Sequence, residues 1–313
     1  MSRTALALAV LLLGVPTADL AAAPALGPAA PGSGAIIGIV RNGSSGQPVG
    51  GQTLHLVFVG PQGPEQIAGT RTDAQGRFAF RGLIDGRYLV QATFQSVSYA
   101  AHAVLSGGPV QMTLQVFDAS SKVALRVAML GLAVDVQPGY VRISEVVHLQ
   151  NPETRTFIGD LVFPLPDGAR YVTYHEGLHR PSVDGRHITD RLIIRPGSHQ
   201  VAYAYTVAGR EEITLDRSLP MPVERLELFT TAPADARSPR LQSLPTVTNE
   251  SRNYTRASGR AIPAGALSLT IIGVPAPRRW PAPAAAGTLA GLLTLGLGWA
   301  AASTARTQTA RRS

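Results

Sequence analysis

The chain has 313 residues, which is room for two domains of ordinary size, and 45% of them are hydrophobic, enough for packed cores. It contains no cysteine, which excludes a disulfide framework, a thiolate zinc site and a cysteine nucleophile. The net charge is +8, but the positive charge is dispersed, and no basic stripe interleaved with aromatic residues indicates nucleic-acid binding. Its 32 glycines and 24 prolines stand between short apolar runs, which favours an all-β fold.

The N-terminus has the three-part pattern of a secretory signal peptide over residues 1–25. Arg3 precedes an apolar run, and small residues follow it up to Ala25. Cleavage after Ala25 fits this pattern, Ala18 offers a second site, and an uncleaved N-terminal anchor is the alternative. Residues 26–33 are rich in Ala, Pro and Gly and predict a flexible linker. We therefore expect the chain to be exported.

The next region begins with β patterns centred on Thr72–Val90, which indicates two short strands joined by polar, glycine-bearing turns. Asp73 can bond its own backbone in such a turn, and Gly76 accepts a positive φ. Phe78 and Phe80 alternate across a pleat. We expect roughly seven strands in a sandwich. Further strands are predicted at 35–41, 54–58, 89–94 and 110–116, with a loop over 60–66.

Residues 34–117 resemble the carboxypeptidase regulatory-like, or transthyretin-like, domain. The resemblance rests on Gly38-Ile39-Val40, Gly46-Gln47-Pro48-Val49, Thr72-Asp73, Gly76-Arg77-Phe78, Gly82-Leu83 and Gly86-Arg87-Tyr88. It implies a prealbumin-like β-sandwich. It also implies a non-catalytic accessory module, because domains of this family are fused to many extracellular proteins and lack the metal ligands of a carboxypeptidase.

The pattern stays β from Lys122 onward and predicts a second β-sandwich over 118–275. Tyr203 and Tyr205 continue one apolar face of a strand, which we interpret as core. Glu211-Glu212 and Asp216 are neighbouring acids that we expect in a loop, where adjacency alone does not indicate paired-carboxylate catalysis.

The segment His175-Glu176-Gly177-Leu178-His179 matches the H-E-x-x-H motif of zinc peptidases. That motif works on a helix, which places both histidines on one face with the glutamate over the metal-bound water. Here Tyr171–Tyr174 are β-prone, Gly177 weakens a helix by about 1 kcal/mol, and Pro181 closes the segment. We therefore assign no catalytic residue, no metal site and no cofactor. His175, Glu176 and His179 stay candidates for zinc only if a turn at Gly177 brings them together, with His187 as a third ligand.

The C-terminal end predicts a transmembrane helix over 282–304. No charge occurs between Arg279 and Arg306, and the core 284–302 is long enough to cross about 30 Å of hydrocarbon. The basic tail 305–313 belongs in the cytoplasm by the positive-inside rule. A sorting tail removed after export is the alternative, although no sorting motif precedes it.

Together these patterns predict a single-pass membrane protein whose bulk faces the periplasm or the cell exterior. Because no catalytic set is present in the sequence, we expect a non-enzymatic protein that binds or scaffolds at the cell envelope. Its expected partners are the membrane and an envelope protein or polysaccharide, not nucleic acid. An accessory subunit of a membrane complex is the first alternative, and a zinc-dependent hydrolase using His175, Glu176 and His179 is the second.

Overall fold

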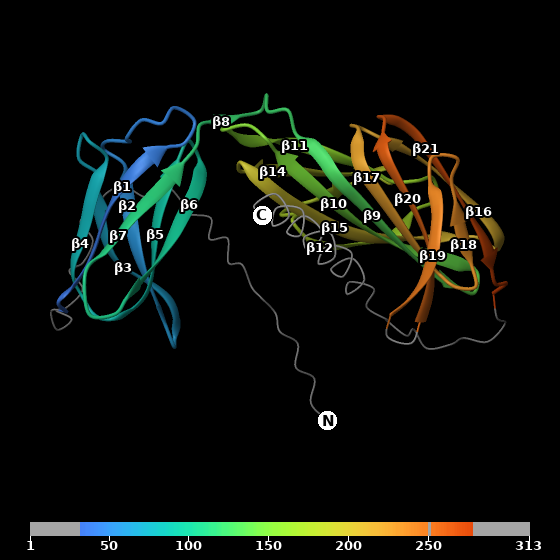
Figure 1. Ribbon diagram of the computed structural model, residues 1–313, viewed down its shortest axis with the longest axis horizontal. Coiled ribbons are helices and arrows are strands. Elements are labelled where there is room, and N and C mark those ends of the chain that lie inside the picture. The colour runs from blue at the N-terminus through green and yellow to red at the C-terminus, as the bar shows by residue number, and fades with distance from the viewer. Residues whose placement is uncertain (1–31, 250–251, 278–313) are drawn as a thin grey trace, which may run out of the picture.

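The computed structural model describes residues 32–249 and 252–277, and every regular element in these ranges is a β-strand. The strands form five sheets, and the buried side chains gather into two large cores (Figure 1). The described part of the chain is therefore all-β, as the sequence predicts for it. The described ranges contain no helix long and apolar enough to cross a bilayer. The expected signal peptide 1–25, span 282–304 and tail 305–313 lie outside them.

The first core belongs to a unit that we call the first β-body, residues 34–116. It has a three-stranded sheet in the order β4-β1-β7 and a four-stranded sheet in the order β3-β2-β5-β6. Side chains from both sheets share one core, so this body agrees with the expected sandwich. Its strands are β1 (Gly34–Asn42), β2 (Thr53–Gly60), β3 (Gly63–Arg71), β4 (Arg77–Leu83), β5 (Gly86–Phe94), β6 (Val97–Leu105) and β7 (Val110–Val116).

The turn before β4 has the chemistry that the sequence predicts. Asp73 Oδ1 accepts hydrogen bonds from the backbone N–H groups of Gln75, at 2.9 Å, and Arg77, at 2.8 Å. Gly76 has φ 74°, and a Cβ there would lie 2.7 Å from the Val40 carbonyl oxygen. Asp73 is therefore a turn residue that leads Phe78 and Phe80 into the core.

One local expectation for this body is wrong, and one strand has no counterpart among the predicted ranges. The loop predicted over 60–66 is shorter, because Gly60 pairs with Gly63 and β3 starts there. Pro64 is tolerated in β3 because this is the edge strand of its sheet, where a missing N–H breaks no ladder. Strand β6 was not predicted, although its buried and exposed residues alternate, because alanines fill it and give a weak apolar signal.

The second β-body, residues 119–274, is built on a seven-stranded sheet in the order β12-β15-β10-β9-β17-β20-β19. A four-stranded sheet, β13-β14-β11-β8, and a three-stranded sheet, β16-β21-β18, complete it. Its strands are β8 (Ala119–Ser120), β9 (Arg126–Gln137), β10 (Tyr140–Asn151), β11 (Thr156–Pro164), β12 (Arg170–Glu176), β13 (Ser182–Val183), β14 (His187–Ile194), β15 (Gly197–Ala208), β16 (Glu211–Leu219), β17 (Val223–Thr231), β18 (Asp235–Arg237), β19 (Gln242–Asn249), β20 (Arg252–Ile262) and β21 (Gly265–Val274).

The two smaller sheets cover one face of the large sheet. Alternate residues of β9, β10 and β15 share a core with residues of β11, β14, β16 and β21. The opposite face of the large sheet carries a separate small cluster, Ala133, Val146 and Ala202. The second region is thus layered like a sandwich, but with one layer divided between two sheets.

Strand β16 corrects another expectation. Glu211, Glu212 and Asp216 lie on this strand rather than in a loop, and all three are exposed. Its opposite face is inward and carries Ile213, Leu215, Arg217 and Leu219. Glu212 and Asp216 therefore belong to the solvent face of a strand whose other face enters the core, and Glu211 is exposed at its first position.

Candidate functional site

The H-E-x-x-H segment is strand and turn. His175 and Glu176 end β12, which is an edge strand of the seven-stranded sheet. Gly177 then turns the chain with φ 74°, and a Cβ there would lie 1.9 Å from the Gln200 carbonyl oxygen on β15. Only glycine fits this crossing without displacing the backbone. The segment therefore lacks the helix that a zinc peptidase motif requires.

The polar groups around this turn are engaged with one another. The Asp190 carboxylate accepts the backbone N–H groups of His179, at 2.5 Å, and Arg180, at 3.2 Å. Glu176 Oε2 accepts from Gln200 Nε2 at 2.9 Å. Burial, aided by the charge of Arg142, lowers the pKa of His175. These contacts shape the turn.

His187, the third residue of the zinc alternative, begins β14 and has its Nδ1 3.3 Å from Asp184 Oδ2. Within the described ranges, no three His, Asp or Glu side chains form a group that could hold a metal ion. The structure thus supplies the turn at Gly177 without assembling the candidate residues into a ligand set.

A second polar group lies inside the core of the second β-body. Glu145 on β10 is fully buried, and Arg217 reaches it from β16, with only 5% of its side chain exposed. The Tyr205 hydroxyl donates to Glu145 Oε1 at 2.6 Å, and the Tyr203 hydroxyl donates to Oε2 at 2.9 Å. Arg217 Nη1 also donates to Oε1. The group therefore links the three-stranded sheet to the seven-stranded sheet through the core.

The protonation states in this group follow from burial and charge. Burial, reinforced by the charge of Glu145, raises the pKa of Tyr203 and Tyr205 well above their ordinary value, so both hydroxyls keep their protons and donate. Burial lowers the pKa of Arg217, but the charge of Glu145 together with Tyr203, Tyr205 and the hydrogen bond to Glu145 outweighs it, so the pKa is raised overall. The guanidinium therefore stays charged and is neutralised by Glu145.

A cavity lies beside this group, with a volume of about 40 Å³. Its walls come from all three sheets and are apolar, with Arg217 as the charged side chain among them. The lining residues are Val127, Leu130, Val147, Leu149, Leu161, Val162, Phe163, Pro164, Tyr203, Arg217, Leu219, Pro220, Met221 and Val223. The buried Nε of Arg217 has no hydrogen-bond partner.

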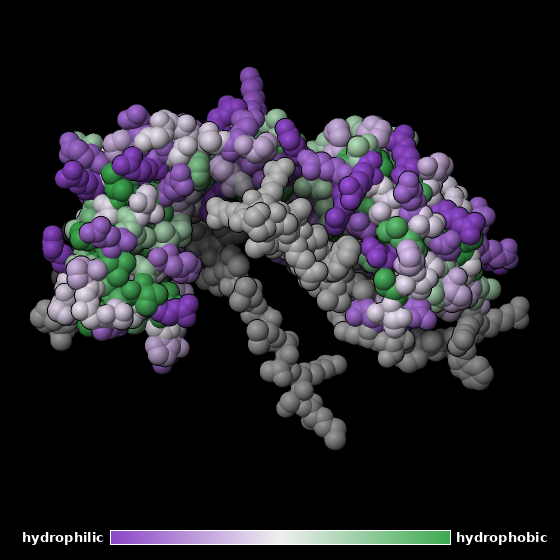
Figure 2. Space-filling model, viewed as in Figure 1, coloured by the Kyte–Doolittle hydropathy of each residue, from purple (hydrophilic) through white to green (hydrophobic). Residues whose placement is uncertain are grey.

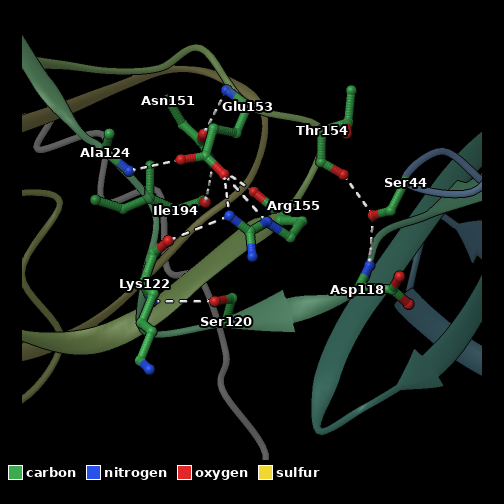
Figure 3. A network of polar contacts seen from close by, with 10 residues as sticks. All are labelled: Ser44, Asp118, Ser120, Lys122, Ala124, Asn151, Glu153, Thr154, Arg155 and Ile194. Atoms are coloured by element: carbon green, nitrogen blue, oxygen red, sulfur yellow. Dashed lines mark hydrogen bonds and ion pairs between the residues drawn. The ribbon is translucent and has the colours of Figure 1, made fainter.

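The two β-bodies are joined by a polar network that Figure 3 shows in detail. Ser44, in the turn after β1, accepts a hydrogen bond from the Asp118 N–H at 2.8 Å and donates to the Thr154 carbonyl oxygen. Beyond it, Glu153 Oε1 accepts from the Ala124 N–H at 2.8 Å and Oε2 pairs with Arg155. The connecting segment is therefore held at both its start and its end.

Direct contacts reinforce this network. The Tyr99 hydroxyl of β6 lies 2.8 Å from Thr156 Oγ1 of β11 and donates to the Phe117 carbonyl oxygen at 3.0 Å. The Arg195 guanidinium lies 5.2 Å from the centre of the Tyr99 ring and donates to the Ser98 carbonyl oxygen. Ile158 of β11 packs against the core of the first β-body. The two bodies thus share polar, cation–π and apolar contacts.

Figure 2 shows hydrophilic residues interspersed with intermediate and hydrophobic ones over the viewed face of both bodies. The larger exposed apolar side chains include Val104, at 60%, and Tyr171, at 80%, which lie on different bodies.

The sequence predicts Tyr203 and Tyr205 as core, and both are buried. It does not reveal their partners Glu145 and Arg217. A signal exists in the strand alternation, because each charge stands at an inward position between apolar residues two places away. Such a charge is buried with a partner, but the sequence does not say which one.

No family model matches the chain, and no curated protein matches it. Among solved structures, the M1 zinc metallopeptidase from Deinococcus radiodurans is similar, with 12% identity and a TM-score of 0.34, over 49% of this chain and 43% of that chain. The major pilin subunit BcpA of Bacillus cereus is similar over 75% of this chain and 87% of that chain, with 12% identity and a TM-score of 0.24. The chain spans less than half of the peptidase's length. Both likenesses are weak, and no activity is transferred from either protein.

Proposed function

We propose that this chain is a membrane-anchored protein of the cell envelope that binds or scaffolds a partner without catalysing a reaction. In this proposal residues 1–25 direct export, 282–304 anchor the chain and 305–313 face the cytoplasm. Residues 34–117 form a transthyretin-like module, and 118–275 form the larger partner-binding body. The export and anchor signals come from the sequence alone.

The observation that carries the proposal is the junction between the two bodies. Hydrogen bonds from Ser44 and Tyr99 and the guanidinium of Arg195 cross it directly. Domains joined by a linker alone reorient freely, whereas several contacts across the junction favour one arrangement, which supports a spacer of fixed shape. A rigid extended spacer suits a scaffold that presents a surface at a set distance from a membrane.

Mild crosslinking of the tagged full-length protein in its native membrane, followed by capture and mass spectrometry, tests the proposal. We expect a reproducible envelope protein or polysaccharide to be captured. Capture of one integral-membrane partner in fixed ratio supports the accessory-subunit form of the same role.

The same preparation tests the hydrolase alternative. We expect no turnover of a peptide mixture or of envelope polymer by the wild type or by His175→Ala. Turnover by the wild type together with stoichiometric zinc, both lost in His175→Ala, would overturn the proposal.

A further inference from the structure

One end of the second β-body is tied to the place where the chain leaves β21. The Pro275 carbonyl oxygen accepts from the Gly139 N–H of the β9–β10 turn at 2.8 Å, and the Gly139 carbonyl oxygen accepts from the Gly209 N–H of the β15–β16 turn at 3.0 Å. On β12, Arg170 pairs with Thr206, close to the same turn. We call this end the exit end, and it comprises residues 137–140, 168–171, 208–212 and 275–277.

The first β-body is attached at the opposite end of the second. Strand β10 begins at Tyr140 in the exit end and finishes at Asn151, and Glu153 and Thr154, just beyond it, belong to the junction (Figure 3). A strand of 12 residues is roughly 35–40 Å long at about 3.3 Å per residue. Figure 1 likewise shows the end of β21 on the side of the second β-body that is remote from the first.

The exit end is close in sequence to the expected membrane anchor. Residues 278–281 separate Pro277 from the anchor expected at 282–304. The chain from 277 to 282 extends over at most about 18 Å, and the headgroup layer on each side of the hydrocarbon is about 5–8 Å thick. With 282–304 in the bilayer, the exit end is therefore held beside the headgroup layer.

The exit end also carries two exposed aromatic side chains. Tyr140 is 41% exposed and Tyr171 is 80% exposed, and Tyr174, further along β12, is exposed as well. The other tyrosines are buried, namely Tyr88, Tyr99, Tyr203, Tyr205 and Tyr254. Tyr171 also has φ 52°, which bulky residues rarely adopt, and the β12–β15 pairing shifts register there. A tyrosine ring with its polar tip suits the interface between water and lipid.

The charges of the exit end decide which lipid it requires. Arg170 and Arg210 are exposed, and each can donate to a lipid phosphate. Glu211 and Glu212, which follow Arg210, are exposed as well and balance this charge. The tyrosines therefore contribute more to a membrane contact than net charge does, and a zwitterionic phospholipid is sufficient.

We propose that the exit end of the second β-body rests in the phospholipid headgroup layer, with Tyr140 and Tyr171 among the headgroups and Arg170 and Arg210 donating to phosphates. This inference rests on the membrane anchor of the proposed function and adds an orientation to it. Strand β10 then points away from the membrane, and the first β-body is outermost.

The test uses the full-length protein reconstituted into phosphatidylcholine vesicles that carry a nitroxide quencher on the headgroup. The chain has no cysteine, so Ala208→Cys and Ser198→Cys each place one fluorophore at an exposed position near either end of β15. The two positions are roughly 33 Å apart along the strand. We expect the nitroxide to quench the fluorophore at 208 at least threefold more strongly than the one at 198.

Matched tyrosine variants of the Ala208→Cys protein test the contact itself. Tyr140→Asn combined with Tyr171→Asn should lower the quenching at 208 at least twofold, because asparagine tolerates a positive φ but supplies no interfacial ring. Tyr174→Asn makes the same change at the exposed tyrosine that pairs with Tyr203, further from the exit end. It should leave the quenching unchanged.

Alkaline carbonate extraction of the same vesicles distinguishes two failures. Release of the protein into the supernatant would contradict the membrane anchor and, with it, the proposed function. Retention with equal quenching at 208 and 198, or with quenching that the paired tyrosine substitutions do not lower, would overturn the headgroup contact alone.

Discussion

At the scale of single residues, the group around Glu145 is the most consequential feature of the second β-body. A carboxylate and a guanidinium are both taken out of water, with two tyrosine hydroxyls completing the coordination of the carboxylate. Such a pair adds little net stability compared with apolar residues, yet losing one partner is severe because the other charge stays buried. The interaction between this carboxylate and guanidinium is therefore best measured by how far substitutions at the two positions depart from additivity.

A double-mutant cycle tests this coupling. Arg217→Met and Glu145→Gln should each lower the free energy of unfolding by about 3–5 kcal/mol. The double variant should lose clearly less than the sum, by at least about 2 kcal/mol, because no uncompensated charge is left behind. Urea unfolding measures all three.

Arg237→Met is the surface control for this cycle, because Arg237 pairs with Asp235 and its side chain is 67% exposed. It should cost less than about 1 kcal/mol. Additive losses at Glu145 and Arg217 would show that the two side chains do not act as a pair.

The raised pKa of the two tyrosines predicts a pH dependence. A raised folded pKa stabilises the fold at every pH below the unfolded value, about 10, and the advantage is lost as the pH rises beyond it. Above pH about 10, the free energy of unfolding should fall by about 1.4 kcal/mol per pH unit for each tyrosine.

The Tyr205→Phe variant measures how much one tyrosine contributes to this pH dependence of the free energy of unfolding. Its slope above pH about 10 should be shallower than that of the wild type by about 1.4 kcal/mol per pH unit, measured by urea unfolding at a series of pH values. Equal slopes would mean that the Tyr205 hydroxyl does not keep its proton through burial.

At the scale of strands and turns, alternation and turn chemistry predict most of the fold. Period-two apolar residues mark β9, β10 and β15, and Asp73 with Gly76 marks the turn before β4. The failures are local. Strand β6 escapes prediction because alanine is a weak strand signal, and the inward Arg217 leaves β16 looking like a polar loop.

The H-E-x-x-H segment shows that a matching motif does not by itself establish a metal site. The letters H-E-x-x-H are present, but the residues before His175 favour a strand and Gly177 crosses β15 in a conformation closed to other residues.

Sequence spacing alone does not report which partner a buried charge finds, because Glu145 and Arg217 are 72 residues apart and meet only when two sheets pack together.

Gly177 gives a prediction at this scale. Gly177→Ala should lower the free energy of unfolding by at least about 3 kcal/mol, because a positive φ costs about 1–2 kcal/mol and a Cβ also collides with the Gln200 backbone. The matched control is Gly185→Ala, where φ is 92° but no atom lies within 4 Å of the added Cβ.

Gly185→Ala should therefore cost only the conformational part, about 1–2 kcal/mol. Thermal or urea unfolding of both variants distinguishes the stability lost to the collision with the Gln200 backbone from the stability lost to the positive φ. Similar losses at the two glycines would show that the chain does not cross β15 tightly at Gly177.

At the scale of the whole molecule, the junction between the two β-bodies decides whether they keep one arrangement. The contacts are of different kinds, with Ser44, from the turn after β1, bonded to Asp118 on the connecting segment, and Tyr99 and Arg195 beside it. Since each alone is worth only about 1 kcal/mol, rigidity depends on their acting together. A spacer of fixed shape is what the proposed scaffold requires.

The most direct measurement is the distance between spin labels on the two bodies, recorded by pulsed electron spin resonance. The chain has no cysteine, so Glu65→Cys and Glu212→Cys, both on exposed strand positions, give one defined pair. We expect a single narrow distance distribution that broadens when Arg195→Ala and Tyr99→Phe are added. A distribution that is already broad in the otherwise unaltered chain would contradict a fixed junction and, with it, the scaffold function that rests on it.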